Sequence, residues 1–241
     1  MEKQDLSGAI GFHANADLLE ELVQLDEAQA RVARLRGKAI LDDAAEQLGN
    51  AGLASSVTTT QRHGSLVETL EEIEKSAALV VIGKRGEHAN FAKGHLGSNL
   101  ERVVRSARVP IWVAAREFRP ISRLLIAFDG GPSSLKAVHH VATQPLLRGL
   151  EYHLLAVGKP SSTLANDLDA AALSLRGAGF SVTSDLLTGD PDEVIATQVT
   201  QRDIDLLVMG AYGHSRVRQL ILGSTTTALI RACQVPLLLF R

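Results

Sequence analysis

Residues 205–241 read DLLVMGAYGHSRVRQLILGSTTTALIRACQVPLLLFR, a pattern that residues 78–116 repeat as ALVVIGKRGEHANFAKGHLGSNLERVVRSARVPIWVAAR. Both stretches run from an aliphatic segment through Gly-x-x-Gly and a basic, polar loop to Leu-Gly-Ser. An amphipathic segment, Val-Pro and a final aliphatic segment follow in each. A duplication of this length indicates two tandem copies of one structural unit.

The second copy alternates short aliphatic runs with segments of helical spacing. Strands are predicted at residues 122–128, 151–157, 181–187, 205–210 and 235–240. Helices are predicted from Pro132 to about Arg148, from 162 to 178, from about 190 and from about 224. Helical crossovers between buried strands are typical of a parallel, doubly wound α/β sheet covered on both faces.

The first copy is shorter at its beginning. Residues 17–49 have the spacing of a long amphipathic helix, and a break near Arg36-Gly37 stays open because glycine weakens a helix. The elements expected next are a strand at 55–61, a helix at 65–76, a strand at 78–83, a helix at 98–107 and a strand at 110–114. Nothing here corresponds to the strand-helix-strand of residues 122–157. The predicted domains are therefore an incomplete copy at 1–117 and a complete copy at 118–241.

Assembly is predicted from the last strand of each copy. In such folds the fifth strand lies at a sheet edge and pairs where it can. Residues 110–114 and 235–240 can therefore meet, within one chain or between two. We expect an intrachain pseudo-dimer of the two domains, and further assembly of whole chains into a homodimer stays open.

Composition excludes several classes of protein. The 241 residues are 45% hydrophobic and 22% charged, with a net charge of −2, so nothing demands a nucleic-acid partner. No apolar run approaches the roughly 20 residues of a membrane span. The N-terminus lacks the basic start and apolar core of a secretion signal. A cytoplasmic location is predicted, and the single cysteine, Cys233, reads as a core residue.

The main chemical motif is Gly210-x2-Gly213-x9-Gly223-Ser224, which links a buried strand to a helix. Glycines let a phosphate approach the main chain, and the free N–H groups at a helix start attract anions. The alternative is an ordinary helix start capped by Ser224. The spacing is not that of a P-loop, and its place after the fourth strand argues against a dinucleotide-binding Rossmann site.

This motif, the final Val-Pro strand, LLIAFDGGPSSLKAV at 124–138 and TGDPDEVI at 188–195 resemble the universal stress protein family. The resemblance covers residues 120–241 and, more weakly, 17–116. It implies five-stranded α/β domains of the adenine nucleotide alpha hydrolase-like type. One subgroup of the family binds ATP, so the resemblance implies ATP as the ligand, alone or with Mg.

The resemblance also implies roles for individual residues. Asp129 would contact the ribose or lie near the adenine, Ala127 would flank the base, and the main chain of Val157 would read the adenine edge. The remaining predicted residues line the ribose and phosphates: Gly210, Gly213, Gly223, Ser224, Thr225 and Thr226. In the first copy the spacing is ten residues, from Gly86 to Gly97, and Asn99 replaces a hydroxyl residue. Two interpretations of this segment stay open. It is either a phosphate site helped by Lys84, Arg85 and Lys93, or a structural relic that binds nothing.

Two other functions stay open at this point. The first is an interaction scaffold that binds no nucleotide and depends on the helix at 17–49. The second is an adenylating or sulfur-transfer enzyme, disfavoured because the turn at 129–132 is Asp-Gly-Gly-Pro. The sequence shows no nucleophile elbow, no paired carboxylates and no metal-ligand spacing of histidines. No catalytic or metal residue is therefore predicted, and any ATP hydrolysis would be slow.

Overall fold

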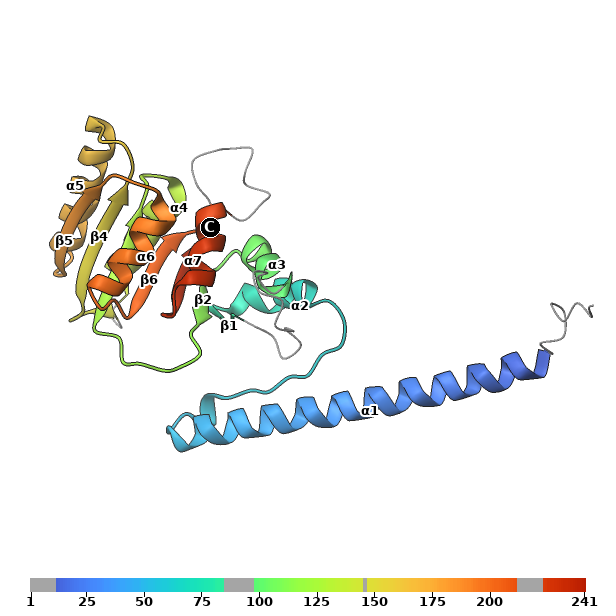
Figure 1. Ribbon diagram of the computed structural model, residues 1–241. Helices are drawn as coiled ribbons and strands as arrows, with labels where there is room; N and C mark the ends of the chain where they lie inside the picture. The colour runs from blue at the N-terminus through green and yellow to red at the C-terminus, as the bar shows by residue number, and fades with distance from the viewer. Residues whose placement is uncertain (1–11, 85–97, 145–146, 212–222) are drawn as a thin grey trace, which may run out of the picture. The chain divides into compact units, whose positions relative to one another are not determined.

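The computed structural model describes residues 12–84, 98–144, 147–211 and 223–241, and the chain forms two compact units that divide after His63 (Figure 1). The first unit contains the helix α1 (Phe12–Asn50) and a short 3₁₀ helix, Ala54–Ser56. In the described parts of both units, no helix is both long enough and apolar enough to cross a membrane.

Helix α1 is continuous, in agreement with the long amphipathic helix predicted there, and no break occurs near Arg36-Gly37. A side chain at residue 37 would collide with Gln61, because a Cβ there would lie 2.2 Å from its Nε2. Gln61 Nε2 also donates to the carbonyl oxygen of Ala33 at 3.5 Å. Gly37 therefore makes room for Gln61 rather than ending the helix.

The strand predicted at residues 55–61 does not form. Ala54–Ser56 is a 3₁₀ turn, and the following residues to His63 have no regular structure. A strand needs a neighbour for its main-chain hydrogen bonds, and residues 57–61 have no strand partner in the described structure. The prediction was wrong because aliphatic and β-branched composition alone cannot supply that neighbour.

The second unit contains all of the sheet. Its helices are α2 (Leu66–Ile73), followed by the 3₁₀ turn Glu74–Ser76, α3 (Ser98–Ser106), α4 (Pro132–Thr143), α5 (Ser162–Gly177), α6 (Pro191–Gln201) and α7 (Ser224–Ala232). Its strands are β1 (Val80–Gly83), β2 (Ile111–Ala114), β3 (Arg123–Phe128), β4 (Glu151–Val157), β5 (Ser181–Leu187), β6 (Leu206–Gly210) and β7 (Leu237–Phe240).

Local sequence explains where these helices begin and end. Ser65 and Ser161 accept hydrogen bonds from the amides of Glu68 and Leu164 and so cap α2 and α5. Pro132 and Pro191 open α4 and α6, where a missing N–H costs nothing. Helix α4 ends at Thr143 rather than at Arg148 as predicted. The sequence continues with Gln144-Pro145, and a residue before proline avoids helical geometry.

The seven strands form one sheet in the order β1-β2-β7-β6-β3-β4-β5. All neighbouring strands are parallel except β2 and β7, which run antiparallel with Trp112 opposite Leu238. The α/β class predicted from the sequence is confirmed. Because the sheet reverses direction at β2–β7, the carboxyl ends of β1 and β2 lie at the opposite edge from those of β3, β4, β6 and β7.

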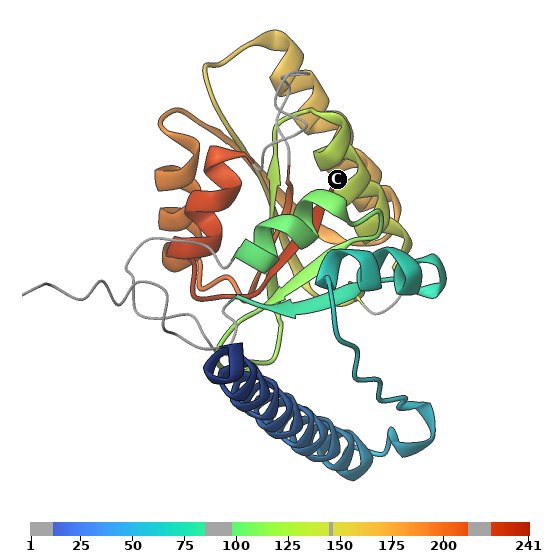
Figure 2. The same ribbon diagram turned by 90° about the vertical axis from the view of Figure 1, so that its right-hand side faces the viewer.

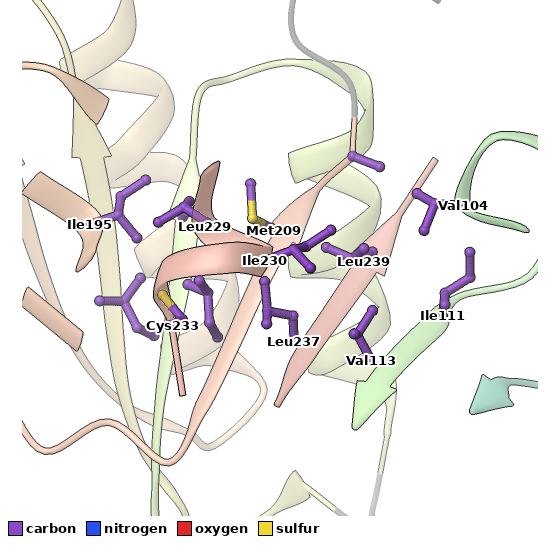
Figure 3. Packing of buried hydrophobic residues seen from close by; sticks show 14 of the residues in the cluster. Val104, Ile111, Val113, Ile195, Met209, Leu229, Ile230, Cys233, Leu237 and Leu239 are labelled. Atoms are coloured by element: carbon purple, nitrogen blue, oxygen red, sulfur yellow. The ribbon is translucent and has the colours of Figure 1, made fainter. Parts of the chain in front are cut away.

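Helices cover both faces of the sheet (Figure 2), and an apolar core fills the space between sheet and helices on each face. One core joins the sheet to α3, α6 and α7, and its central residues include Met209, Leu229, Ile230 and Leu237 (Figure 3). The other core joins the sheet to α4 and α5. Cys233 is buried in the first core, as a small apolar residue would be.

Candidate functional site

The predicted nucleotide residues gather at the carboxyl ends of three strands. Ala127 is paired with Met209 across β3 and β6, so Asp129 and Gly210 follow at the same edge of the sheet. Val157 ends β4 at that edge and is half-buried. Open parallel sheets bind ligands at this edge, where loops and helix N-termini converge.

Asp129 is held in a defined orientation by the turn that follows β3. Its Oδ1 accepts hydrogen bonds from the amide of Gly131 at 2.8 Å and from the hydroxyl of Ser134 at 2.7 Å. Gly130 adopts a φ of 75°, which glycine tolerates and other residues rarely do. The carboxylate is nevertheless exposed, so it can meet a ligand without leaving this turn.

Ser134 was missed by sequence reasoning. It is buried, and it lies in the first turn of α4, five residues after the aspartate whose carboxylate it orients. The signal was present as a pair of serines after the Asp-Gly-Gly-Pro turn, of which Ser134 is the second. Residues in that position commonly bond to nearby main-chain or turn groups, so the hydroxyl can be recognised as a positioning group.

Gly210 is required by the close approach of α4 to β6. A Cβ at this position would lie 2.8 Å from the Cβ of Ser133 and 3.3 Å from the amide nitrogen of Ser134. Real Cβ atoms do not approach other carbons so closely, so any side chain would push α4 away from the sheet. The glycine thus fixes the start of α4, and with it Asp129, beside the end of β6.

The start of α7 is fastened to the same place. The amide of Gly223 donates to the carbonyl oxygen of Ala211 at 3.3 Å, and the hydroxyl of Thr226 contacts that oxygen at 3.2 Å. Thr226 is buried, Thr225 is half-buried and Ser224 is exposed. Gly223 has no side chain to cap the helix, so the α7 N-terminus retains its attraction for anions. Gly213 lies outside the described residues.

The first copy uses its basic residue differently. The ammonium of Lys84 donates to the carbonyl oxygen of Cys233 and, at 3.2 Å, to that of Val235. These carbonyls lie at the C-terminal end of α7, where a cation is favourable. Burial lowers the pKa of Lys84, and the Cys233 thiol opposes this shift. Arg85, Lys93 and Gly86, also named for a phosphate site, lie outside the described residues.

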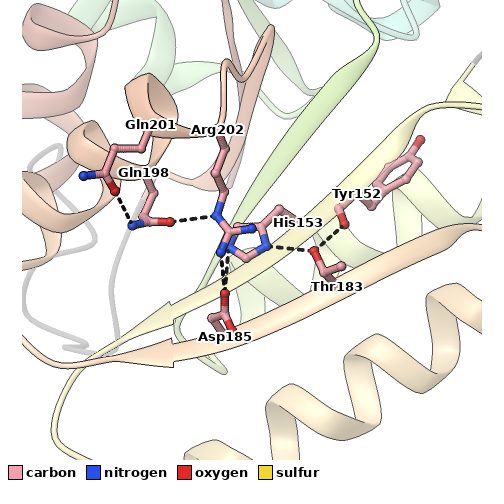
Figure 4. Close-up of polar contacts among 7 residues, drawn as sticks. All are labelled: Tyr152, His153, Thr183, Asp185, Gln198, Gln201 and Arg202. Carbon is pink, nitrogen blue, oxygen red and sulfur yellow. Dashed lines mark hydrogen bonds and ion pairs between the residues drawn. The ribbon is translucent and has the colours of Figure 1, made fainter.

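A separate polar cluster joins β4, β5 and α6 (Figure 4). His153 is 4% exposed, and its Nδ1 lies 3.0 Å from Thr183 Oγ1. Among the described residues, its Nε2 has no hydrogen-bond partner. Asp185 lies 3.7 Å from that Nε2 and 2.6 Å from the guanidinium of Arg202. Burial, and then the Arg202 charge, lower the pKa of His153, whereas Asp185 raises it.

Comparison with known proteins decides the family. The model of the universal stress protein family matches residues 10–115 and 162–241, which include parts of both copies. The chain belongs to the universal stress protein family. The tandem organisation read from the sequence agrees with a match in two segments.

Individual universal stress proteins align over most of the chain. Universal stress protein Slr1230 of Synechocystis is 38% identical over 244 residues, covering all of this chain and 84% of that protein. Universal stress protein Rv1996 of Mycobacterium tuberculosis is 25% identical over 219 residues, covering 81% and 68%.

Solved structures support the fold. A universal stress protein from Archaeoglobus fulgidus matches with a TM-score of 0.70 and 23% identity, covering 90% of this chain and 78% of that one. One from Pseudomonas aeruginosa matches with a TM-score of 0.62 and 21% identity, covering 84% and 77%. At these identities the structures establish the architecture of the chain and nothing about its ligand.

Proposed function

We propose that this universal stress protein binds an adenine nucleotide, with ATP as the expected ligand, at the edge formed by the second copy. The observation that carries this proposal is the convergence of three elements. An oriented carboxylate, Asp129, directly follows β3, and Gly210 ends β6. The α7 N-terminus is tied to the end of β6 through Gly223.

Each part suits one part of a nucleotide. A carboxylate accepts hydrogen bonds from ribose hydroxyls, and the half-buried end of β4 at Val157 offers main-chain groups to a base edge. Main-chain amides at the start of α7, with the exposed hydroxyl of Ser224, suit phosphate oxygens. Thr226 donates toward Ala211, so we assign it to anchoring the helix as well as lining the phosphate path.

Bound Mg would be held mainly by the phosphates of the nucleotide. Among the described residues, no group of three His, Cys, Asp or Glu side chains could hold a metal ion unaided. The carboxylate of Asp129 lies at this edge and could share in coordination, directly or through water. We propose that binding stabilises a signalling conformation and that hydrolysis, where it occurs, is slow.

The test is the thermal unfolding midpoint with and without millimolar Mg-ATP. A ligand that binds only the native state stabilises it by about 2.7 kcal/mol at 100 times its Kd, so the midpoint should rise by several degrees. Nucleotide released on denaturing the freshly purified protein would identify the ligand. No midpoint shift together with no released nucleotide contradicts the proposal.

Ser224→Glu separates phosphate binding from folding. A carboxylate in the first turn of α7 favours the helix by about 0.3–1 kcal/mol, yet it repels phosphate. We expect this variant to fold and to lose the shift with Mg-ATP. Ser162→Glu places the same charge at the first position of α5, also exposed, and should keep the full shift. Equal shifts in both variants would place the phosphates elsewhere.

The interaction scaffold is a second candidate, favoured by α1. Its described portion exposes many large apolar side chains to solvent, at Leu18, Leu19, Leu22, Val23, Leu25, Val32, Leu35, Ile40 and Leu48. A helix with this surface suits a protein partner. If the Mg-ATP experiments fail, capture of a partner that depends on Leu22 and Leu25 would support the scaffold instead.

Location and assembly belong to the same proposal. We propose that residues 1–117 and 118–241 act as a pseudo-dimer of domains in the cytoplasm and that whole chains can form a homodimer. Cell fractionation tests the compartment, and light scattering over a range of concentrations tests the homodimer.

A further inference from the structure

The two copies differ at one side of a corresponding strand. In the second copy, β6 pairs with β7 on one side and with β3 on the other. Its counterpart in the first copy, β1, pairs with β2 and lies at the end of the sheet. The main-chain groups on the outer side of β1 are therefore available for a further strand within the described structure.

The sheet surface beside this edge is apolar, and no described helix of the second unit covers it. Leu238, Trp112 and Val81 lie opposite one another on three neighbouring strands, so their side chains share one face. Leu238 is 3% exposed, Trp112 is partly buried against the same core, and Val81 is 65% exposed. The core that α4 and α5 cover in the second copy thus continues outward to β1, where no described helix of the second unit covers Val81.

The other face of β1 is already filled. Val80 and Ile82 pack against the core formed with α3, α6 and α7. Parallel strands are normally buried on both faces, so β1 has one satisfied face and one unsatisfied face. A partner that only extended the sheet would leave Val81 exposed, and a suitable partner must bring its own helix.

Residues 55–61, which were expected to form a strand, also indicate that neighbouring strands are missing from the first copy. In the second copy, β3 and β4 lie between β6 and β5 in the sheet. The first-copy counterparts of β6 and β5 are β1 and residues 55–61. Within the described structure, β1 has no neighbouring strand on that side, and residues 55–61 form no strand. Both segments therefore lack the strands that β3 and β4 provide in the second copy.

We propose that the outer edge of β1 and the apolar face at Val81 form a docking site for a strand-helix-strand unit. This unit would have the sequence pattern of residues 120–160: an aliphatic strand, an Asp-Gly turn, a helix opened by proline and a second aliphatic strand. Its first strand pairs parallel with β1 as β3 pairs with β6, and its helix covers Val81 and Trp112. By analogy with the pair Ile126–Val208, the residue equivalent to Ile126 lies opposite Val81.

A synthetic, fluorescently labelled polypeptide of residues 120–160, added to the whole chain, tests the docking site. The first strand of this polypeptide pairs with β6 in the second copy. It should also pair with β1, because β1 ends in VVIG and β6 ends in the similar sequence LVMG. We expect saturable binding by fluorescence anisotropy and slower amide exchange at residues 80–83. Val81→Lys should weaken binding at least tenfold by placing a charge on the covered face, at a position exposed enough for the chain to fold.

Leu173→Lys is the matched control. Leu173 is 69% exposed on α5, so Leu173→Lys adds the same charge at an exposed apolar position away from β1. We expect it to bind the polypeptide like the original chain. Absence of binding, or binding that Val81→Lys does not weaken, overturns the proposal. So does concentration-dependent dimerisation that Val81→Lys abolishes, because the occupant of the edge would then be a second copy.

Joining the polypeptide to the chain through a flexible Gly/Ser linker keeps the test decisive if the free polypeptide precipitates. Docking predicts that the joined chain is more stable and that Val81→Lys costs more stability in it than in the original chain. Equal costs in the two chains would show that the attached unit does not contact Val81, and the proposal would fall.

Discussion

The start of α4 approaches β6 so closely that a Cβ on Gly210 would lie 2.8 Å from the Cβ of Ser133. We therefore expect Gly210→Ala to lower the free energy of unfolding by about 1–3 kcal/mol, the usual cost of overpacking. Urea unfolding measures this change. Gly177→Ala is the control, because a Cβ there meets nothing within 4 Å and alanine favours the helix. A Gly210→Ala protein as stable as the original would contradict the close approach.

Ser134 should act on nucleotide binding through Asp129. Ser134→Ala removes the hydrogen bond to Oδ1 and should cost about 1 kcal/mol of stability. On the proposed function, it should also weaken nucleotide binding, by less than Asp129→Ala does. Calorimetric titration of the three proteins gives the order of affinities. Ser174→Ala, an exposed serine on α5, should change neither quantity.

Lys84 should stabilise the junction between the copies. Lys84→Met keeps the length of the side chain but removes its hydrogen bonds to the carbonyls of Cys233 and Val235. Because hydrogen bonds to charged groups contribute about 1.5–3 kcal/mol, the free energy of unfolding should fall by a similar amount. Lys75→Met, at an exposed position of the same copy, should stay within about 0.5 kcal/mol of the original. Similar effects of both changes would show that the Lys84 contacts add nothing.

The second copy could be predicted almost element by element. Strands β3, β6 and β7 are buried along most of their length and read as aliphatic runs. The edge strand β5 is only partly buried, yet β4 and β5 both have the bounds that the sequence predicts. The starts of α4, α5 and α6 could also be located, because proline or serine stands at the first position of each helix. The end of α4 was misplaced because the restriction before Pro145 was overlooked.

What could not be predicted depends on distant neighbours. Residues 55–61 have the composition of a strand, but the described structure gives them no partner strand. Gly37 does not break α1, and its missing side chain leaves space for Gln61. In the candidate site, the sequence indicated Asp129 and Gly210 through their places at strand ends. It could not show that Ser133 packs on Gly210, or that Lys84 reaches the end of α7, because these contacts join residues far apart in the chain.

His153 should make stability depend on pH. Its pKa is lowered from the ordinary value of 6.5, so the unfolded chain binds a proton more readily than the folded one. The free energy of unfolding should therefore decrease as pH falls below 6.5, until the lowered pKa is reached. Urea unfolding between pH 7 and pH 5 should show this loss, and His153→Gln should reduce it.

His140 contributes with the same sign, because burial, and then His139, lower its pKa. His140→Gln should remove a separate part of the pH dependence, and the double variant should remove both parts. NMR titration of the two imidazoles assigns each part to its residue. A His153 imidazole that titrates above 6.5 in the folded protein would reverse the predicted direction.

The antiparallel contact between β2 and β7 joins two edges that belong to a single polypeptide. Such a junction survives dilution, since neither half can diffuse away from the other. Each half also always meets the same mate, unlike subunits that exchange freely. Because the second half is permanently attached, the first half does not have to bind a ligand by itself. It can lose its own ligand pocket and still cover the edge strand β7 of the second half.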